Sequence, residues 1–202
     1  QAAAMAHVTG LTVERTDAYV TLDAATRRNL EISETLRGEP APTLLSTLDT
    51  CVTSMGSRLM RHWLHHPLRD RQVLRARLAA VGSLLDRGPE ALRDALQSVV
   101  DVERIVARIA LRSARPRDLS GLRDSLSDLP SVVAHVATHD DPRLAALAAS
   151  LTVDPEVPAL LHRALLATPA ALLREGGVIA DGYDADLDEL RSIQSGASDY
   201  LI

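Results

Sequence analysis

Apolar residues recur along most of this chain with helical spacing. From Asp70 onward they stand three and four residues apart in one segment after another, which predicts a mostly helical fold. Acidic and hydroxyl residues before these segments are typical N-caps, and Gly88-Pro89 separates two of them. We expect helices to open at Asp23, Thr53 or Ser54, Asp70, Asp101 and Asp184, and further helices around residues 144–151 and 160–166.

The most regular apolar pattern follows Arg115-Pro116-Arg117-Asp118. Its members stand alternately three and four residues apart: Leu119, Leu122, Leu126, Leu129, Val133 and Val136. This heptad seam predicts a long antiparallel or coiled-coil neighbour. Pro130 lies inside the seam and predicts a kink or an interruption of the helix.

Residues 43–68 predict a structural corner: a short apolar helix, a turn and a second helix. In the second helix Leu59 and Trp63 stand four residues apart, and Leu64 extends the same apolar character. Pro67 ends this helix, because proline cannot continue helical hydrogen bonding and restricts the residue before it.

Two segments depart from the helical pattern. Residues 11–22 contain short β-prone runs around a polar turn, which predicts a short N-terminal β segment. Gly176-Gly177 separates two apolar runs, which predicts a small β-hairpin or tight turn near residues 172–179. The predicted fold class is therefore mostly α: an irregular multi-helix bundle with these two small β elements.

Composition narrows the class of protein. The 202 residues include no Phe, one Trp and three Tyr, so Leu, Ala and Val must form the core. All 22 basic residues are arginine, and the net charge of −5 disfavours a domain that coats nucleic acid by charge alone. A local basic patch remains open, and Arg27-Arg28 and Arg115-Pro116-Arg117 could contact phosphate, although solvated helix ends are the commoner role of such pairs.

The expected location is cytoplasmic. The lone cysteine, Cys51, excludes an internal disulfide and fits a reducing compartment. No apolar run reaches the roughly 18–20 residues that a membrane span needs, and no signal peptide opens the chain. We expect no membrane partner.

Residues that could carry chemistry are few. His62 and His66 stand four residues apart and could hold a metal, as in a metal hydrolase, but the glutamate of H-E-x-x-H and a third ligand are missing. The acidic residues at 184–189 lack the glycine and glutamate of a calcium loop. No phosphate loop, dinucleotide fingerprint or nucleophile elbow occurs. We predict no catalytic, cofactor or metal residue, and no enzyme activity for this chain by itself.

Four ordered blocks resemble one family, the MutS family of DNA mismatch-repair ATPases. These blocks are Leu22-Asp23-Ala24-Ala25-Thr26-Arg27-Arg28-Asn29-Leu30-Glu31-Ile32; Met55-Gly56-Ser57-Arg58 with Trp63-Leu64; Asp101-Val102-Glu103-Arg104-Ile105 with Ala114-Arg115-Pro116-Arg117-Asp118-Leu119; and Gly176-Gly177-Val178-Ile179 with Gly182-Tyr183 and Leu187-Asp188-Glu189-Leu190. The resemblance implies that residues 1–21 end a connector domain. Residues 22–202 would then form the first half of the core (lever) domain, stopping before the clamp.

The resemblance also implies what a full-length parent does. Such a parent binds ATP and Mg²⁺ and mismatched duplex DNA, pairs with a second MutS subunit as a homodimer, and acts with downstream repair proteins such as MutL. The Phe-x-Glu mismatch reader and the nucleotide-binding loop are absent from this chain. The chain would be the structural and allosteric core that couples DNA clamping to the ATPase domain.

We expect packing residues to carry that coupling. The candidates are Leu59, Trp63 and Leu64 in the corner, and Leu119, Leu122, Leu126 and Leu129 in the seam. Seams without a partner also predict self-association of the isolated chain. The alternatives are a freestanding helical DNA-binding or protein-interaction module, and the metal hydrolase described above.

Overall fold

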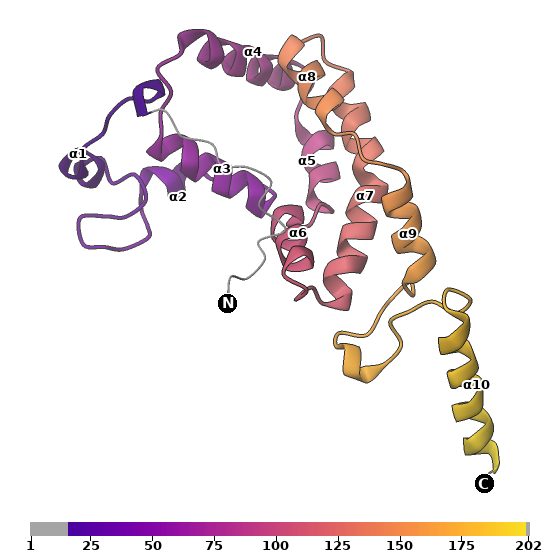
Figure 1. Cartoon of the computed structure of the whole chain (residues 1–202). Coiled ribbons are helices and arrows are strands. Elements are labelled where there is room, and N and C mark those ends of the chain that lie inside the picture. Colours follow the sequence, from indigo (N-terminus) through magenta and orange to yellow (C-terminus); the bar gives the residue numbers. More distant parts are fainter. Residues whose placement is uncertain (1–15, 201–202) are drawn as a thin grey trace.

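The computed structural model describes residues 16–200, with side chains placed as far as Gln194 (Figure 1). The mostly helical prediction is confirmed. The helices are α1 (Ala24–Asn29), α2 (Leu44–Leu48), α3 (Ser54–His65), α4 (Arg71–Arg87), α5 (Glu90–Gln97), α6 (Val102–Ala110), α7 (Pro116–Ala137), α8 (Pro142–Ser150), α9 (Glu156–Ala164) and α10 (Ala185–Tyr200), with 3₁₀ turns η1 (Thr16–Ala18) and η2 (Leu173–Glu175).

Helix α7 is the centre of the fold, since α5, α6, α8 and α9 all pack against it. Figure 1 shows these helices as one bundle, with α4 leading away from its top toward α1–α3 and α10 projecting from the opposite end. The hydrophobic core is small: Ala80, Val136 and Leu144 form a buried cluster, with partly buried apolar side chains around it. The described residues include no large side chain that is fully buried.

The predicted seam lies on α7, with Leu122 and Val136 buried and its other members half-buried. Several shorter helices cover α7 in the described part of the chain, in place of one long neighbour. Of the two effects predicted for Pro130, a kink or an interruption, the interruption is wrong, because α7 runs through this proline. Buried residues before and after the proline, Leu122 and Val132, hold both halves against the bundle. This packing offsets the roughly 3 kcal/mol that a proline costs inside a helix.

The predicted β-hairpin near residues 172–179 is wrong. The 3₁₀ turn Leu173–Glu175 occupies its first half, and both residues of Gly176-Gly177 take positive φ angles, 71° and 63°. These glycines turn the chain away from 172 and toward the end of α9. There Leu165 and Ile179 form an isolated antiparallel bridge.

The predicted N-terminal β segment, residues 11–22, is not a strand where the structure describes it; residues 11–15 lie outside the described range. Tyr19 instead forms an isolated antiparallel bridge with Leu68. The pairing stays short, because the extended segment around Leu68 lies between the end of α3 at His65 and the cap of α4 at Asp70.

Candidate functional site

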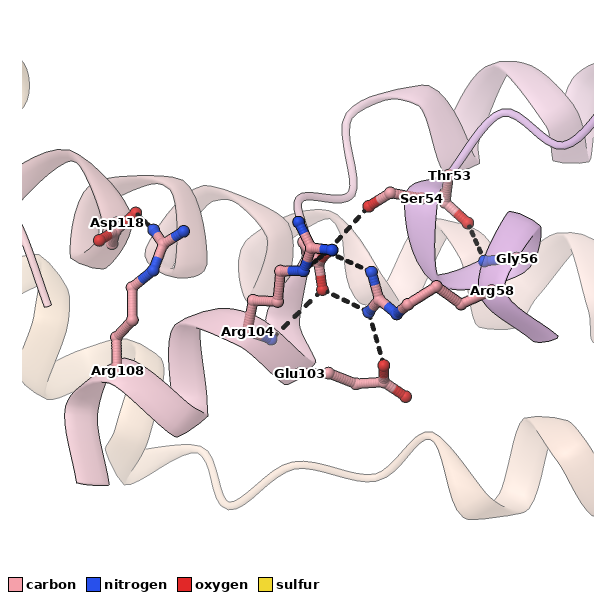
Figure 2. A network of polar contacts seen from close by, with 9 residues as sticks. Thr53, Ser54, Gly56, Arg58, Glu103, Arg104, Arg108 and Asp118 are labelled. Carbon is pink, nitrogen blue, oxygen red and sulfur yellow. Dashed lines mark hydrogen bonds and ion pairs between the residues drawn. The ribbon is translucent and has the colours of Figure 1, made fainter. Parts of the chain in front are cut away.

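A polar network joins α3 to α6 across 43 residues of sequence (Figure 2). The guanidinium of Arg58 donates to both carboxylate oxygens of Asp101, at 2.6 and 2.7 Å, and to Glu103 at 2.6 Å. Ser54 Oγ donates to the same Asp101 carboxylate at 2.9 Å. Two parallel bonds between a guanidinium and a carboxylate fix both distance and orientation. The network therefore constrains how α3 sits on α6.

Local sequence places both partners. Thr53 caps α3 by accepting a hydrogen bond from the Gly56 backbone at 3.1 Å, so Arg58 lies in the first turns of that helix. A Cβ on Gly56 would come within 3.1 Å of Thr53 Oγ1 and 3.2 Å of Cys51 Cβ, so a side chain there would crowd this cap. Asp101 caps α6 by accepting from the Arg104 backbone at 3.2 Å. The two helix N-termini therefore face each other.

The contact between Arg58 and Asp101 keeps both groups ionised. The hydrogen bonds from Arg58 hold the pKa of Asp101 well below its usual range, and those from Ser54 and the Arg104 backbone add to the shift against the effect of burial. The same carboxylate, with Glu103, raises the pKa of Arg58 further above its ordinary value. Both members of this ion pair are therefore charged at neutral pH.

A second link joins α6 to α7. Arg108 donates to Asp118 at 2.6 Å, and the other oxygen of Asp118 accepts from the Arg115 backbone at 2.9 Å, where α7 begins with the buried Pro116. The bond from the Arg115 backbone, with that from Arg108, lowers the pKa of Asp118. We call the two links together the α3–α6–α7 junction; its residues are Ser54, Arg58, Asp101, Glu103, Arg104, Arg108 and Asp118.

Helix α6 ends next to this junction in a strained residue. Arg112 has φ 53°, in the left-handed region. Its backbone N–H donates to Ile109 O at 2.9 Å, and the backbone N–H of Ser113 donates to Arg108 O at 2.8 Å. This is a Schellman-type end, where glycine is the usual residue.

Replacing Arg112 by glycine should therefore raise the free energy of unfolding by about 0.5–1 kcal/mol, because glycine removes the clash of the left-handed conformation. Urea denaturation followed by circular dichroism measures the change. Arg112→Ala keeps a Cβ and should bring no such gain; an equal gain in both variants would contradict the argument.

The structure places the predicted corner residues at the meeting of α3 and α4. Trp63 is half-buried, and the guanidinium of Arg77 lies over its ring, 3.8 Å from the centroid. Burial lowers the pKa of Arg77, and the nearby Arg143 lowers it further. Leu64 is half-buried, whereas Leu59 is 48% exposed. Trp63 and Leu64 lie on the same helix as Arg58, one member of the α3–α6–α7 junction. Leu119, the first leucine of the α7 seam, directly follows Asp118, another member of the junction.

Two buried polar residues of α7 were missed by sequence reasoning. Arg123, 6% exposed, donates to the carbonyls of Leu166 at 2.9 Å and Ala167 at 2.8 Å, which ties α7 to the chain after α9. Ser125, 2% exposed, accepts from the Val100 backbone at 2.9 Å. Both stand between seam leucines, where a single sequence does not distinguish them from solvated polar residues.

The histidine pair forms a ring stack. His62 and His66 lie with centroids 4.5 Å apart, and Nδ1 of His66 is 3.1 Å from the carbonyl of His62. Residues 16–194 contain no group of three or more His, Cys, Asp or Glu placed to hold a metal ion.

These features define a class of protein: an elongated helical scaffold whose helices are linked end to end by charge-assisted hydrogen bonds. The chain belongs to the MutS domain III family, whose model matches residues 25–200. MutS domain III is the core (lever) part of mismatch repair proteins, so the predicted membership of the MutS family is confirmed. None of the helices within the described range has the length and apolar character needed to cross a membrane.

The family match gives the junction added meaning. Most residues of the α3–α6–α7 junction come from two of the blocks that resemble MutS. These are the second block, Met55-Gly56-Ser57-Arg58, and the third block, residues 101–105 with 114–119. Segments separated by more than 40 residues thus meet at one place in the fold.

Proposed function

We propose that this chain is the structural and allosteric core of a DNA mismatch-recognition ATPase, in which it couples DNA clamping to the ATPase domain. The observation that supports this most is the α3–α6–α7 junction, which links three helices in series through oriented ion pairs. Packed helices of this kind shift between discrete arrangements as semi-rigid units.

The proposed transmission follows the contacts. A rotation of α3 displaces Arg58, whose two bonds to Asp101 carry α6 with it. Helix α6 in turn displaces the N-terminus of α7 through the ion pair between Arg108 and Asp118. Since α7 contacts four other helices, movement at its N-terminus spreads through the bundle. Breaking any one link should uncouple the ends without unfolding the helices.

The rest of the proposal concerns the full-length protein. ATP and Mg²⁺ would bind outside this chain, whose own ionised side chains at the junction are engaged in structural bonds. Mismatched duplex DNA, a second subunit in a homodimer and downstream proteins such as MutL would be its partners, in the cytoplasm. This chain by itself would not be an enzyme.

The test is the substitution Trp63→Ala in the full-length protein. Removing the ring takes away the surface on which Arg77 rests, so ATP should release the protein from a mismatch less effectively. We expect the coupling between ATP and DNA binding to fall by about two- to thirtyfold. Stopped-flow release of mismatched duplex by ATP measures it.

Trp63→Phe is the matched control, since it keeps an aromatic face under Arg77. It should retain most of the coupling. A folded Trp63→Ala protein that shows wild-type coupling would refute the role of the corner.

A further inference from the structure

A cavity of about 630 Å³ opens between α1, the loop that follows it and α3. Four arginines from these three elements line it: Arg27 and Arg28 from α1, Arg37 from the loop and Arg61 from α3. His65 stands one turn after Arg61 and lines the same cavity. Figure 1 shows α1 and its loop at the left, well away from the α7 bundle.

The wall of this cavity is held in place by its own hydrogen bonds. Glu31 accepts from the Leu36 backbone at 2.7 Å, and the Arg28 guanidinium donates to Leu36 O at 3.3 Å. Ile32 is 3% exposed and anchors the loop. Ser33 Oγ lies 3.0 Å from Nε2 of His65, which connects the loop to α3.

Positive charge exceeds negative charge among the residues at this cavity. Within the described residues, Arg27, Arg37 and Arg61 form no ion pair with a carboxylate, and Glu34 is the one acidic residue among those that line the cavity. The effect reaches His65: burial lowers the pKa of His65 first, and the charges of Arg61 and Arg27 lower it further, against Glu34. Four guanidinium groups against two carboxylates, that of Glu34 and that of Glu31 in the wall, leave an excess of positive charge.

We infer that this cavity binds a phosphate-bearing polyanion through its phosphate groups. A guanidinium group forms paired hydrogen bonds with phosphate oxygens. Four guanidinium groups therefore favour a ligand that carries several negative charges. The volume falls in the range of about 300–1,000 Å³ typical of ligand sites. No Trp, Tyr or Phe lines the cavity, so bases have no aromatic platform on which to stack. The ligand is therefore the backbone of a nucleic acid or a free polyphosphate.

Isothermal titration calorimetry of this 202-residue chain tests the site, with inorganic tripolyphosphate and a short matched DNA duplex as separate probes. We expect one site for at least one probe, weakened about tenfold by Arg27→Gln and by Arg61→Gln. For the duplex, log Kobs should fall by about three to four per tenfold rise in salt. Arg163→Gln removes an exposed arginine of α9 that is outside the cavity and should change nothing.

An NMR titration of the histidine side chains measures the pKa of His65 with and without the probe, and so tests the site independently of calorimetry. A bound anion offsets the charges of Arg61 and Arg27, so it should raise the pKa of His65. Duplex binding without tripolyphosphate binding would identify a nucleic-acid backbone, and the reverse a free polyphosphate. Three results would overturn the inference. The first is binding that Arg27→Gln and Arg61→Gln leave unchanged, and the second is displacement of the probe by polyglutamate as effective as that by phosphate compounds. The third is that neither probe binds.

Discussion

Replacing Arg123 by methionine should lower the free energy of unfolding of this chain by about 2–4 kcal/mol. Methionine fills much of the same space but donates no hydrogen bond, so the carbonyls of Leu166 and Ala167 lose their partner. Hydrogen bonds from a charged donor contribute roughly 1.5–3 kcal/mol each. Arg123 is 6% exposed, so its loss removes two such bonds from a buried donor. The melting temperature should fall by about 5–15 °C.

Urea denaturation and thermal melting, both followed by circular dichroism, measure this effect. Arg117→Met is the matched control, since Arg117 is exposed on the same helix, and should change stability by less than about 0.5 kcal/mol. Equal stability of the two variants would show that Arg123 does not hold the chain after α9 to α7.

Replacing Asp101 should weaken the α3–α6–α7 junction in a manner that depends on pH. Asp101→Asn keeps an N-cap for α6 but loses the charge that Arg58 binds. Asp101→Ala loses the cap as well and should be less stable than Asp101→Asn by about 1 kcal/mol. The pKa of Asp101 is lower in the folded protein than in the unfolded chain, where it is about 3.9.

The sign of the pH effect follows from linkage. The charge of Asp101 contributes its full stabilisation above about pH 4–5, and this contribution is lost as the pH falls through the folded pKa. The gap in unfolding free energy between wild type and Asp101→Asn should thus be constant from pH 7 to 5 and shrink below pH 4. Urea unfolding at pH 7, 5 and 3 measures it. Asp128→Asn, an exposed site on α7, controls for general charge loss; a gap of constant size down to pH 3 would count against the ion pair.

Features that depend on neighbouring residues were predictable from sequence. The caps at Asp23, Asp70 and Asp101 were expected, because each bonds to backbone within three residues. The hairpin near 172–179 failed because the extended partner lies at Leu165, before the turn that the glycines suggested. Local pattern shows that a chain turns, but not which distant segment it meets.

In the candidate site, too, local features were predictable from sequence and contacts between distant residues were not. The corner at Trp63 and the blocks that resemble MutS were found from spacing and motif, while the pairing of Arg58 with Asp101 joins residues 43 positions apart. Arginine and aspartate at helix starts usually face solvent, so only the arrangement of α3 and α6 shows that these two meet. For Arg123 the residue type itself misled, since arginine is rarely buried.

Trp63 is the single tryptophan of these 202 residues, and a cation lies against its ring. When it is excited at wavelengths that the three tyrosines do not absorb, the ultraviolet emission comes from one place, the meeting of α3 and α4. Any movement of Arg77 away from the indole changes the wavelength and intensity of that emission. Trp63 is thus an intrinsic fluorescent probe of the corner. The rate at which α3 and α4 separate there can be measured in solution without attaching a dye.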